Sequence, residues 1–397
     1  GGTDEFSEEW GVWHDRAEFA DAWNTTNAVD RARTAPVDFD WTTAYGLYLR
    51  GEQALREKDD RAADEYLRKS LAKEPCLAPA LVTLAELCYR RANIREAWAL
   101  AEKALRINAY DPAANYLSGM VAKDRGEGMK ALERLGLAAY SPYWRAAACA
   151  EMAKIHLAQG DFRSVLAAAR KCRDANAKSI DGYALSVLAL RGLGESSAAE
   201  SLLREARGIW PLARLLVSLD GNREPTRNAW PMETEMEVAT WYLGSGLVAD
   251  AKRHFAAAKG LMGELMCAYL DQDDAALAKV SAENVRFVFA HRRECVSALD
   301  WAIKVNGGWK FRYLRAQFAA ANGVSRRVLD SLRKAYEDRT PVDAIVHEKM
   351  MDLFRLYLIV GGMPSVVARY LATNNLQEVT QEQRAILALY RQDIAKY

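Results

Sequence analysis

The sequence predicts an all-α protein, a solenoid of stacked helix pairs, and three observations support this fold class. Small residues recur at a spacing of 34 along the first half of the chain, in three registers. The segments between them have apolar residues at i, i+3, i+4 and i+7, which is the pattern of an amphipathic helix. These segments end at Pro or Asp-Pro, which stops a helix. The three registers are Gly51, Ala85, Gly119, Ala153 and Val187; Ala63, Ala97, Ala131, Val165 and Ala199; and Ser70, Ala104, Ala138, Cys172 and Ala206.

A period of 34 residues is typical of tetratricopeptide repeats. Each such repeat is an antiparallel helix pair whose helices approach closely, so only small side chains fit at the register positions. The clearest helical segments are "RAADEYLRKSLAKEP", residues 61–75, and "REAWALAEKALRINAYDP", residues 95–112. We therefore expect five tetratricopeptide repeats over residues 43–211.

The period breaks after residue 211. Residues 212–232 contain prolines and no sustained helical pattern, so we expect a connector there. Within it, "LLVSLD" at residues 215–220 has the apolar run and aspartate of a Walker B strand. The chain lacks a phosphate loop of the form G-x-x-x-x-G-K-[ST], so we interpret this match as chance. Helical patterns return in residues 233–317, where we expect degenerate helical repeats, and no segment has the pattern of a sheet.

The first 42 residues form a separate region that is rich in aromatic side chains. Trp10, Trp13, Phe19 and Trp23 have near-helical spacing and precede the extended stretch "TAPVDFDW". One interpretation is a cap that buries the open end of the solenoid, because terminal repeats expose an apolar face. The alternative is an aromatic platform for a sugar.

Composition argues against several classes of partner. The 54 Lys and Arg residues against 53 Asp and Glu leave a formal charge of +1, which indicates no basic stripe for nucleic acid or anionic lipid. No apolar run reaches the ~20 residues of a membrane helix. The six cysteines never form C-x-x-C, so we expect buried thiols, which favour a reducing compartment such as the cytoplasm. The opening "GGTDEF" lacks a start methionine and is interpreted as a tag remnant or a cut from a longer chain, which leaves the localisation unknown.

Residues 2–322 resemble the C-terminal tetratricopeptide region of large bacterial proteins whose upstream part is a mutarotase-like β-sandwich of unknown function. The resemblance is carried by "WGVWHD", "PVDFDWTTAYGLYLRG", "APALVTLAELCYRR", "YDPAANYLSG", "YSPYWRAAACAEMA" and "FVFAHRRECVSALDWAIKVNGGWKFRYL". It implies a carbohydrate-related setting in which the sandwich supplies any sugar chemistry. The sandwich has no counterpart in this sequence.

Residues 318–397 resemble a different group, the segment after the ATPase core in prokaryotic ATP-binding proteins with a C-terminal domain of unknown function. "HEKMMDLFRLYLIVGGMP", residues 347–364, is the most specific part. The resemblance implies a helix-to-helix turn at the two glycines, and the local pattern agrees, because Gly favours a helix C-cap and Pro a helix start. None of that group's ATP-binding motifs has a matching position. We therefore interpret the chain as a composite joined near residues 319–324, by natural fusion or by joined reading frames, with a divergent tail of a single family as the alternative.

No catalytic arrangement is evident. "HEKMM" begins at His347 but has Met351 where the zinc-protease motif H-E-x-x-H has its second histidine. No Ser-His-Asp, Cys-His or paired-carboxylate arrangement stands out. We expect no catalytic, cofactor-binding or metal-binding residues, no cofactor, and no catalytic activity. The remaining histidines lie in unrelated segments: His14, His156, His254 and His291.

The candidate functional surface is the concave groove of the solenoid, which the first helix of each repeat should line. Aromatic and arginine side chains at such positions are typical peptide anchors, although solvated residues on a curved scaffold would give the same pattern. A clamp for the carboxylate of a chaperone tail is not expected, because such domains have Lys and Asn where this chain has Tyr48 and Glu52. The candidate groove residues are Tyr48, Glu52, Arg56, Glu86, Arg90, Tyr116, Met120 and Lys154.

The function that these observations favour is a non-catalytic scaffold. Its groove would bind a protein or peptide, or the chain's own missing upstream domain, with no nucleic acid and no membrane span. The first alternative is an accessory region of a carbohydrate-active or sugar-binding protein whose β-sandwich is missing. A fragment of an ATP-binding protein ranks third. The oligomeric state has no signal in the sequence.

Overall fold

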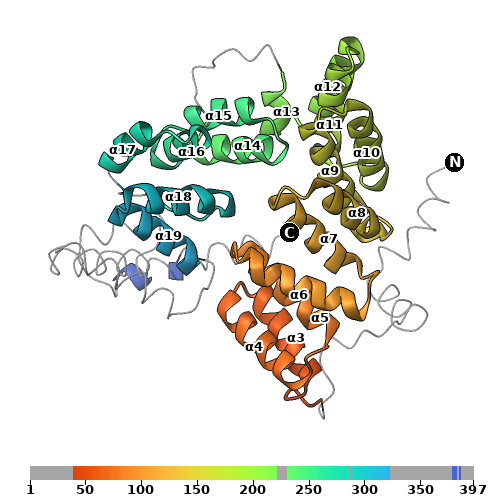
Figure 1. The fold of residues 1–397 in the computed structure, drawn as a ribbon, viewed down its shortest axis with the longest axis vertical. Helices are drawn as coiled ribbons and strands as arrows, with labels where there is room; N and C mark the ends of the chain where they lie inside the picture. The colour runs from red at the N-terminus through yellow and green to blue at the C-terminus, as the bar shows by residue number, and fades with distance from the viewer. Residues whose placement is uncertain are drawn as a thin grey trace. The chain divides into compact units, whose positions relative to one another are not determined.

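The computed structural model describes residues 39–220, 230–283, 285, 288–321, 378–381 and 384–385. Every regular element in this part of the chain is a helix, and none of its residues forms a strand (Figure 1). The predicted all-α class is confirmed. The helices form two compact units, described separately below.

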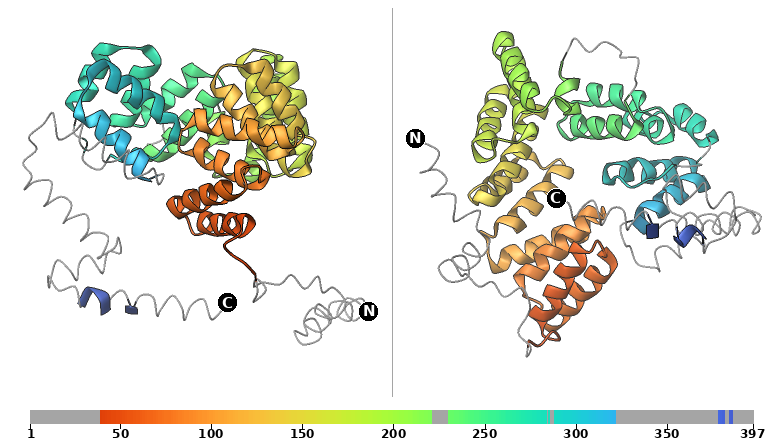
Figure 2. Two further views of the ribbon diagram at one scale, coloured as in Figure 1. Left: turned by 60° about the horizontal axis from the view of Figure 1, so that its bottom comes forward. Right: turned by 180° about the vertical axis from the view of Figure 1, so that it is seen from behind.

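Unit 1 contains the described residues up to Met152, together with residues 171–177. Its helices follow one another as hairpins, and both views in Figure 2 show successive pairs stacked side by side. They are α3 (Ala44–Arg56), α4 (Asp60–Lys73), α5 (Ala78–Arg90), α6 (Ile94–Ile107), α7 (Pro112–Asp124) and α8 (Gly128–Ala138). The next pair, α9 (Pro142–Ala158) and α10 (Phe162–Ala175), contributes residues to both units.

Unit 2 contains residues 153–170 and the described residues from 178 onward. Its helices are α11 (Ile180–Gly192), α12 (Ser196–Ile209), α13 (Arg214–Ser218), α14 (Met232–Gly244), α15 (Val248–Ala257), α16 (Leu261–Asp271), α17 (Asp274–Ala282), the 3₁₀ turn η1 (Arg293–Cys295), α18 (Val296–Asn306) and α19 (Trp309–Ala321). The string "LLVSLD" therefore overlaps a short helix, α13, and is not a Walker B strand. Helices α15 to α17 have only 10, 11 and 9 residues.

The small residues of the three registers are all buried. A Cβ added to Gly51 would lie 2.9 Å from Cγ of Leu67, and one added to Gly119 would lie 2.8 Å from Cγ of Leu135. Both leucines belong to the second helix of the same pair and are fully buried. Because interiors are packed to crystal-like density, a larger side chain at these positions would push the two helices apart.

A fourth register lies in the turn between the helices of each pair. Residues 58, 92, 126, 160 and 194 all have positive φ, between 57° and 81°. The amide of Lys58 donates to Leu55 O and that of Asp59 to Ala54 O, which is the hydrogen-bond pattern of a Schellman cap. Glycine occupies the last three of these positions, whereas Lys58 and Ala92 adopt the left-handed conformation at a steric cost.

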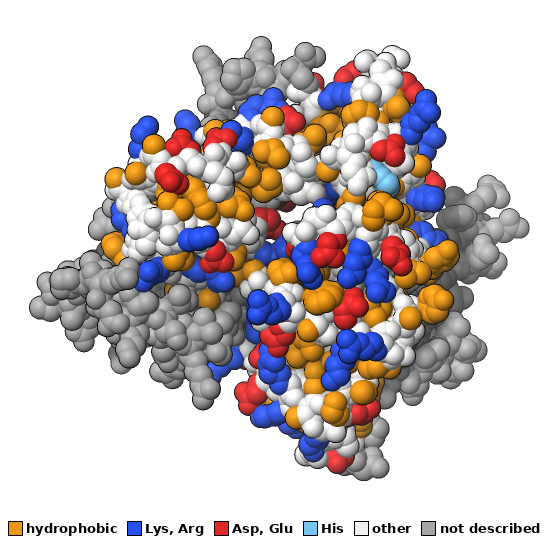
Figure 3. All heavy atoms as spheres, in the orientation of Figure 1, with side chains coloured by type: hydrophobic (Ala, Val, Ile, Leu, Met, Phe, Trp, Pro, Cys, Tyr) orange, Lys and Arg blue, Asp and Glu red, His pale blue; other side chains and the backbone are white. Residues whose placement is uncertain are grey.

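Several sequence predictions lie outside the described residues. The predicted aromatic cap or platform covers residues 1–42, of which residues 1–38 lie outside. The motif at His347 and the glycine turn at residues 361–362 also lie outside. Of the predicted tail, residues 318–397, only the end of α19, the helical residues 378–381 and residues 384–385 are described. On the face shown in Figure 3, basic and acidic side chains are interspersed, consistent with the formal charge of +1.

Candidate functional site

The predicted groove residues lie on the first helices of the pairs. We call the exposed sides of α3, α5 and α7, all in unit 1, the first-helix face. Four of the candidate side chains on this face are half-buried, namely Tyr48, Glu52, Tyr116 and Met120. The other three, Arg56, Glu86 and Arg90, are exposed. The distribution is Tyr48, Glu52 and Arg56 on α3, Glu86 and Arg90 on α5, Tyr116 and Met120 on α7, with Lys154 on α9 in unit 2.

A chain of hydrogen bonds joins α3 to α5 on this face. The Thr83 hydroxyl donates to Glu52 Oε1 at 3.0 Å and is itself hydrogen-bonded to Tyr48. Burial raises the pKa of Tyr48, and the negative charge of Glu52 raises it further, so the phenol keeps its proton. Two of the predicted anchors are thus partly used to hold neighbouring helices together.

Two charged residues on the face remain available. Arg56 and Glu86 are exposed, and neither makes a hydrogen bond or ion pair within the part of the chain that the structure describes. Each is equivalent by the 34-residue period to a residue that does: Arg56 to Arg90, and Glu86 to Glu52. The face therefore offers one free cation and one free anion beside fixed partners.

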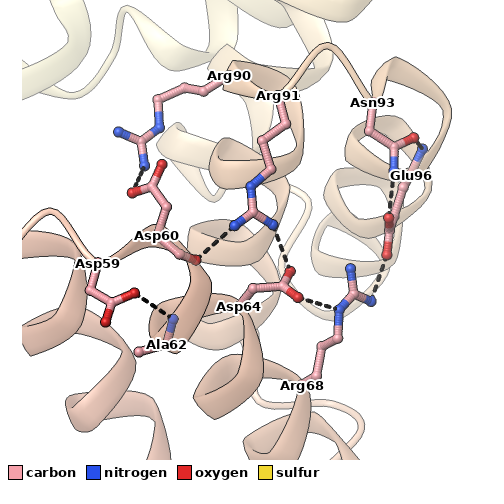
Figure 4. Close-up of polar contacts among 9 residues, drawn as sticks. All are labelled: Asp59, Asp60, Ala62, Asp64, Arg68, Arg90, Arg91, Asn93 and Glu96. Atoms are coloured by element: carbon pink, nitrogen blue, oxygen red, sulfur yellow. Dashed lines mark hydrogen bonds and ion pairs between the residues drawn. The ribbon is translucent and has the colours of Figure 1, made fainter. Parts of the chain in front are cut away.

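Arg90 and its neighbour Arg91 belong to an ionic network between the first two pairs (Figure 4). Arg90 Nη2 lies 3.2 Å from Asp60 Oδ1, and both side chains reach solvent. Arg91 is 8% exposed at its side chain, donates to the carbonyl of Asp60 at 2.7 Å and lies 3.1 Å from Asp64 Oδ1. The turn after α5 is thereby held against the start of α4, which fixes the base from which Arg90 extends.

The same network continues to α6. Arg68 Nε lies 3.1 Å from Asp64 and its Nη1 lies 2.7 Å from Glu96. The hydrogen bond that Arg68 donates to Glu96 is the main reason that the pKa of Arg68 is above its usual value. Asn93 donates to the other oxygen of Glu96 at 2.6 Å while its own oxygen caps the first turn of α6 (Figure 4). Three helices, α4, α5 and α6, are therefore connected by one set of charges.

Tyr116 marks the other end of the first-helix face. Its ring packs on Trp144 of α9 with centroids 4.7 Å apart, within reach of an offset stack. Nearby, Lys123 Nζ lies 2.6 Å from Glu151, with both side chains largely buried, so α7 and α9 are joined by an ion pair. Tyr116 thus presents one face to its neighbour and only part of its ring to solvent.

Lys154 is not arranged as a free anchor. In unit 2 its side chain is largely buried, its Nζ lies 3.4 Å from Asp181 Oδ2, and it also lies 5.8 Å from the ring centroid of Trp241. The indole of Trp241 donates to the other oxygen of Asp181 at 2.9 Å. This cluster ties α9, α11 and α14 together.

A buried histidine pair in unit 2 is the nearest approach to a catalytic arrangement. His254 Nδ1 lies 2.7 Å from Glu235 Oε2, and both side chains are almost fully buried. The imidazole is stacked between Trp230 and Tyr242, and Tyr242 is hydrogen-bonded to Ser218. No substrate can reach a pair enclosed in this way, so we interpret it as structural.

The buried thiols of Cys88 and Cys295 are poor nucleophiles. A small hollow at the start of α14 is lined by Met232, Met236, Met262 and Cys295, but burial raises the pKa of the Cys295 thiol to about 12. Burial likewise raises the pKa of Cys88 to about 12. Among the described residues no group of His, Cys, Asp and Glu side chains could hold a metal ion, and no helix is long and apolar enough to cross a membrane.

Sequence reasoning missed Thr83, Asp60 and Asp64, which organise the predicted anchors. Thr83 follows Val82 in a helix of mainly apolar residues, and nothing in its neighbourhood marks it as a partner for α3. The acidic residues before and within α4 could have been found as an N-terminal charge pattern, because Asp59 and Asp60 open that helix.

One protein family matches part of the chain. It is described as the fifth ARM-repeat domain of TT21 and matches residues 49–157, which run from α3 to α9. No curated protein matches the sequence.

Solved structures with similar architecture are tetratricopeptide proteins. One from Parabacteroides merdae ATCC 43184 is 13% identical with a TM-score of 0.40, covering 74% of this chain and 98% of its own. MamA from Desulfovibrio magneticus RS-1 is 15% identical with a TM-score of 0.39, covering 43% and 96%. YrrB, described as having an unusual peptide-binding site, is 17% identical with a TM-score of 0.39, covering 44% and 91%. Likeness at this level concerns the helical-repeat fold alone.

Proposed function

We propose that this chain is a non-catalytic helical-repeat scaffold that binds a protein or peptide segment through the first-helix face. The observation that carries the proposal is the contrast between fixed and free side chains on that face. Glu52, Arg90 and Tyr116 are held by neighbouring elements, whereas Arg56 and Glu86 are exposed and form no hydrogen bond or ion pair with the residues that the structure describes. Anchors on a rigid base lose little conformational entropy on binding, which favours recognition.

The partner is expected to be an extended or helical segment of mixed charge. Arg56 would pair with a carboxylate of the partner and Glu86 with a lysine or arginine, while Tyr48 and Tyr116 supply partly buried aromatic surface. A domain upstream in the same polypeptide is one partner of this kind.

The test is a selection of random 12-residue peptides displayed on phage against the full chain, followed by affinity measurement for charge-reversed variants. We expect Arg56→Glu and Glu86→Lys each to weaken selected peptides by about tenfold, equivalent to 1.4 kcal/mol. The matched controls are Arg95→Glu and Glu133→Lys, which change equally exposed charges on second helices α6 and α8. Equal losses in both sets, or peptides insensitive to all four changes, would argue against the first-helix face.

The carbohydrate-related setting and the ATPase-like tail remain predictions from resemblance. The first is checked by binding of labelled oligosaccharides to the full chain, with saturable binding as the supporting outcome. The second is checked with labelled ATP, and absence of binding would remove the nucleotide interpretation.

A further inference from the structure

A second surface of unit 1 concentrates exposed aromatic side chains away from the solenoid core. Tyr110, Tyr140 and Tyr143 are 78%, 79% and 84% exposed, and Trp144 beside them is half-buried. We call these four residues the aromatic edge. Side chains this exposed contribute almost nothing to folding, and a contiguous apolar patch on a soluble protein marks an interaction surface.

The edge is built from two equivalent loops. "AYDP" at residues 109–112 and "AYSP" at residues 139–142 each place a tyrosine two positions before the proline that opens the next first helix, α7 or α9. The corresponding loops before α5 and α11 read "EPCL" and "NAKS" and carry no aromatic residue. The tyrosines are therefore a local addition rather than a requirement of the repeat.

A ring contact joins the beginnings of the two helices that follow these loops. Tyr116, in the second turn of α7, stacks on Trp144, in the first turn of α9, at 4.7 Å. Trp144 in turn meets Tyr143 edge to face at 5.5 Å. Tyr110 and Tyr140 stand in the loops that immediately precede these two helices.

The exposed basic side chains closest to these tyrosines in the sequence are Arg106 and Arg145. Arg145 is exposed and uses Nε and Nη2 to bind the carbonyls of Ala139 and Tyr140, at 3.0 and 3.1 Å, which leaves its remaining N–H groups to solvent. Arg106, at the end of α6, is exposed and makes no hydrogen bond or ion pair with any described residue. The acid in these loops, Asp111, is engaged in capping α7, where its carboxylate accepts from the Ala114 amide at 2.8 Å.

We propose that the aromatic edge is a docking surface for an acidic peptide segment of a partner protein, one in which aromatic or leucine side chains stand among Asp and Glu. The tyrosines would cover the apolar side chains, and Arg106 and Arg145 would pair with the carboxylates. The aromatic edge adjoins the first-helix face where Trp144 packs on Tyr116, but none of its exposed tyrosines belongs to that face, so its test does not depend on whether Arg56 and Glu86 bind a ligand.

The test uses the full chain and a fluorescein-labelled 12-residue peptide in which Phe and Leu stand among Glu residues. Fluorescence anisotropy should give saturable binding that weakens with added salt, and a peptide with Lys in place of every Glu should bind at least tenfold more weakly. The combined variant Tyr110→Ser, Tyr140→Ser, Tyr143→Ser should lose at least tenfold in affinity, and Arg106→Glu should lose several-fold with the aromatic residues intact.

Two controls separate this surface from the others. Met129→Ser removes an equally exposed apolar side chain, at 80%, from the opposite turn of the α7/α8 pair, and Arg95→Glu reverses an exposed charge at the other end of α6 from Arg106; both should leave the affinity unchanged. Circular dichroism checks that every variant keeps its helices. The proposal is overturned if the Lys peptide binds equally well, if the tyrosine variant binds like the unaltered chain, or if the acidic peptide does not bind.

Discussion

Thr83 of α5 donates a 3.0 Å hydrogen bond to Glu52 of α3, joining two first helices across 31 residues of sequence. Replacing Glu52 by Ala removes the charged acceptor and leaves a partly buried hydroxyl pair without it. We expect the free energy of unfolding to fall by about 1 kcal/mol, the usual effect of a hydrogen bond to a charged group that keeps some solvent contact. Urea unfolding followed by circular dichroism measures the change.

Glu86 provides the matched control for this prediction. It occupies the equivalent position one period later, is exposed, and its side chain makes no hydrogen bond or ion pair with a described residue. Glu86→Ala should therefore change stability by less than about 0.5 kcal/mol. Similar losses for the two variants would mean that the bond to Thr83 does not stabilise the pair of helices.

The neighbouring arginines at the end of α5 should differ in their contribution. Arg91→Met removes a buried guanidinium and leaves Asp64 with one partner fewer, so we expect a loss of about 2 kcal/mol. Arg90→Met breaks an exposed pair with Asp60 and should cost less than about 1 kcal/mol. Thermal unfolding of the two variants side by side compares them, and a larger effect at Arg90 would contradict the network in Figure 4.

At the left-handed turn positions, replacing alanine by glycine should raise stability and replacing glycine by alanine should lower it. Ala92→Gly should stabilise by about 0.5 kcal/mol, because relief of the strained φ exceeds the added entropy of the unfolded chain. Gly160→Ala should destabilise by about 1 kcal/mol for the same reason in reverse. Gly136→Ala in α8, where nothing lies within 4 Å of an added Cβ, is the control and should stabilise. Urea unfolding midpoints measure the three changes. A shift in the same direction for all three variants would contradict the left-handed conformation of residues 92 and 160.

Thiol reactivity should single out one cysteine. Cys76 is exposed, whereas Cys88, Cys149, Cys172 and Cys295 are buried and Cys267 is intermediate. Burial raises the pKa of Cys88 and Cys295 to about 12, so little thiolate forms there at neutral pH. Reaction of the folded chain with a disulfide reagent at pH 8 should show one fast thiol, which Cys76→Ser removes. Fast reaction of a second thiol would show that a buried site opens readily.

The helix pairs could be predicted because their cause is local and steric. Small residues such as Gly51 and Gly119 mark close helix contacts, and the structure places Leu67 and Leu135 against them. The left-handed register was also readable at Gly126, Gly160 and Gly194, but Lys58 and Ala92 concealed its first two members. Turn positions with positive φ can be recognised in a sequence only where glycine occupies them.

The partners of the groove candidates could not be predicted in the same way. Whether Lys154 reaches solvent or Asp181 depends on the distance between α9 and α11, which the period of small residues does not specify. The same holds for Arg91 and Asp64, whose pairing follows from how one helix pair stacks on the next. Residue type indicated which side chains can bind a partner, and tertiary packing decided which of them remain free.

The measurement that tests the central claim most directly is hydrogen exchange of the full chain with and without a peptide selected by display. If the first-helix face is the binding surface, the peptide should slow exchange in α3, α5 and α7 and leave α4, α6 and α8 unchanged. Protection confined to the second helices, or spread evenly over both sets, would contradict the account.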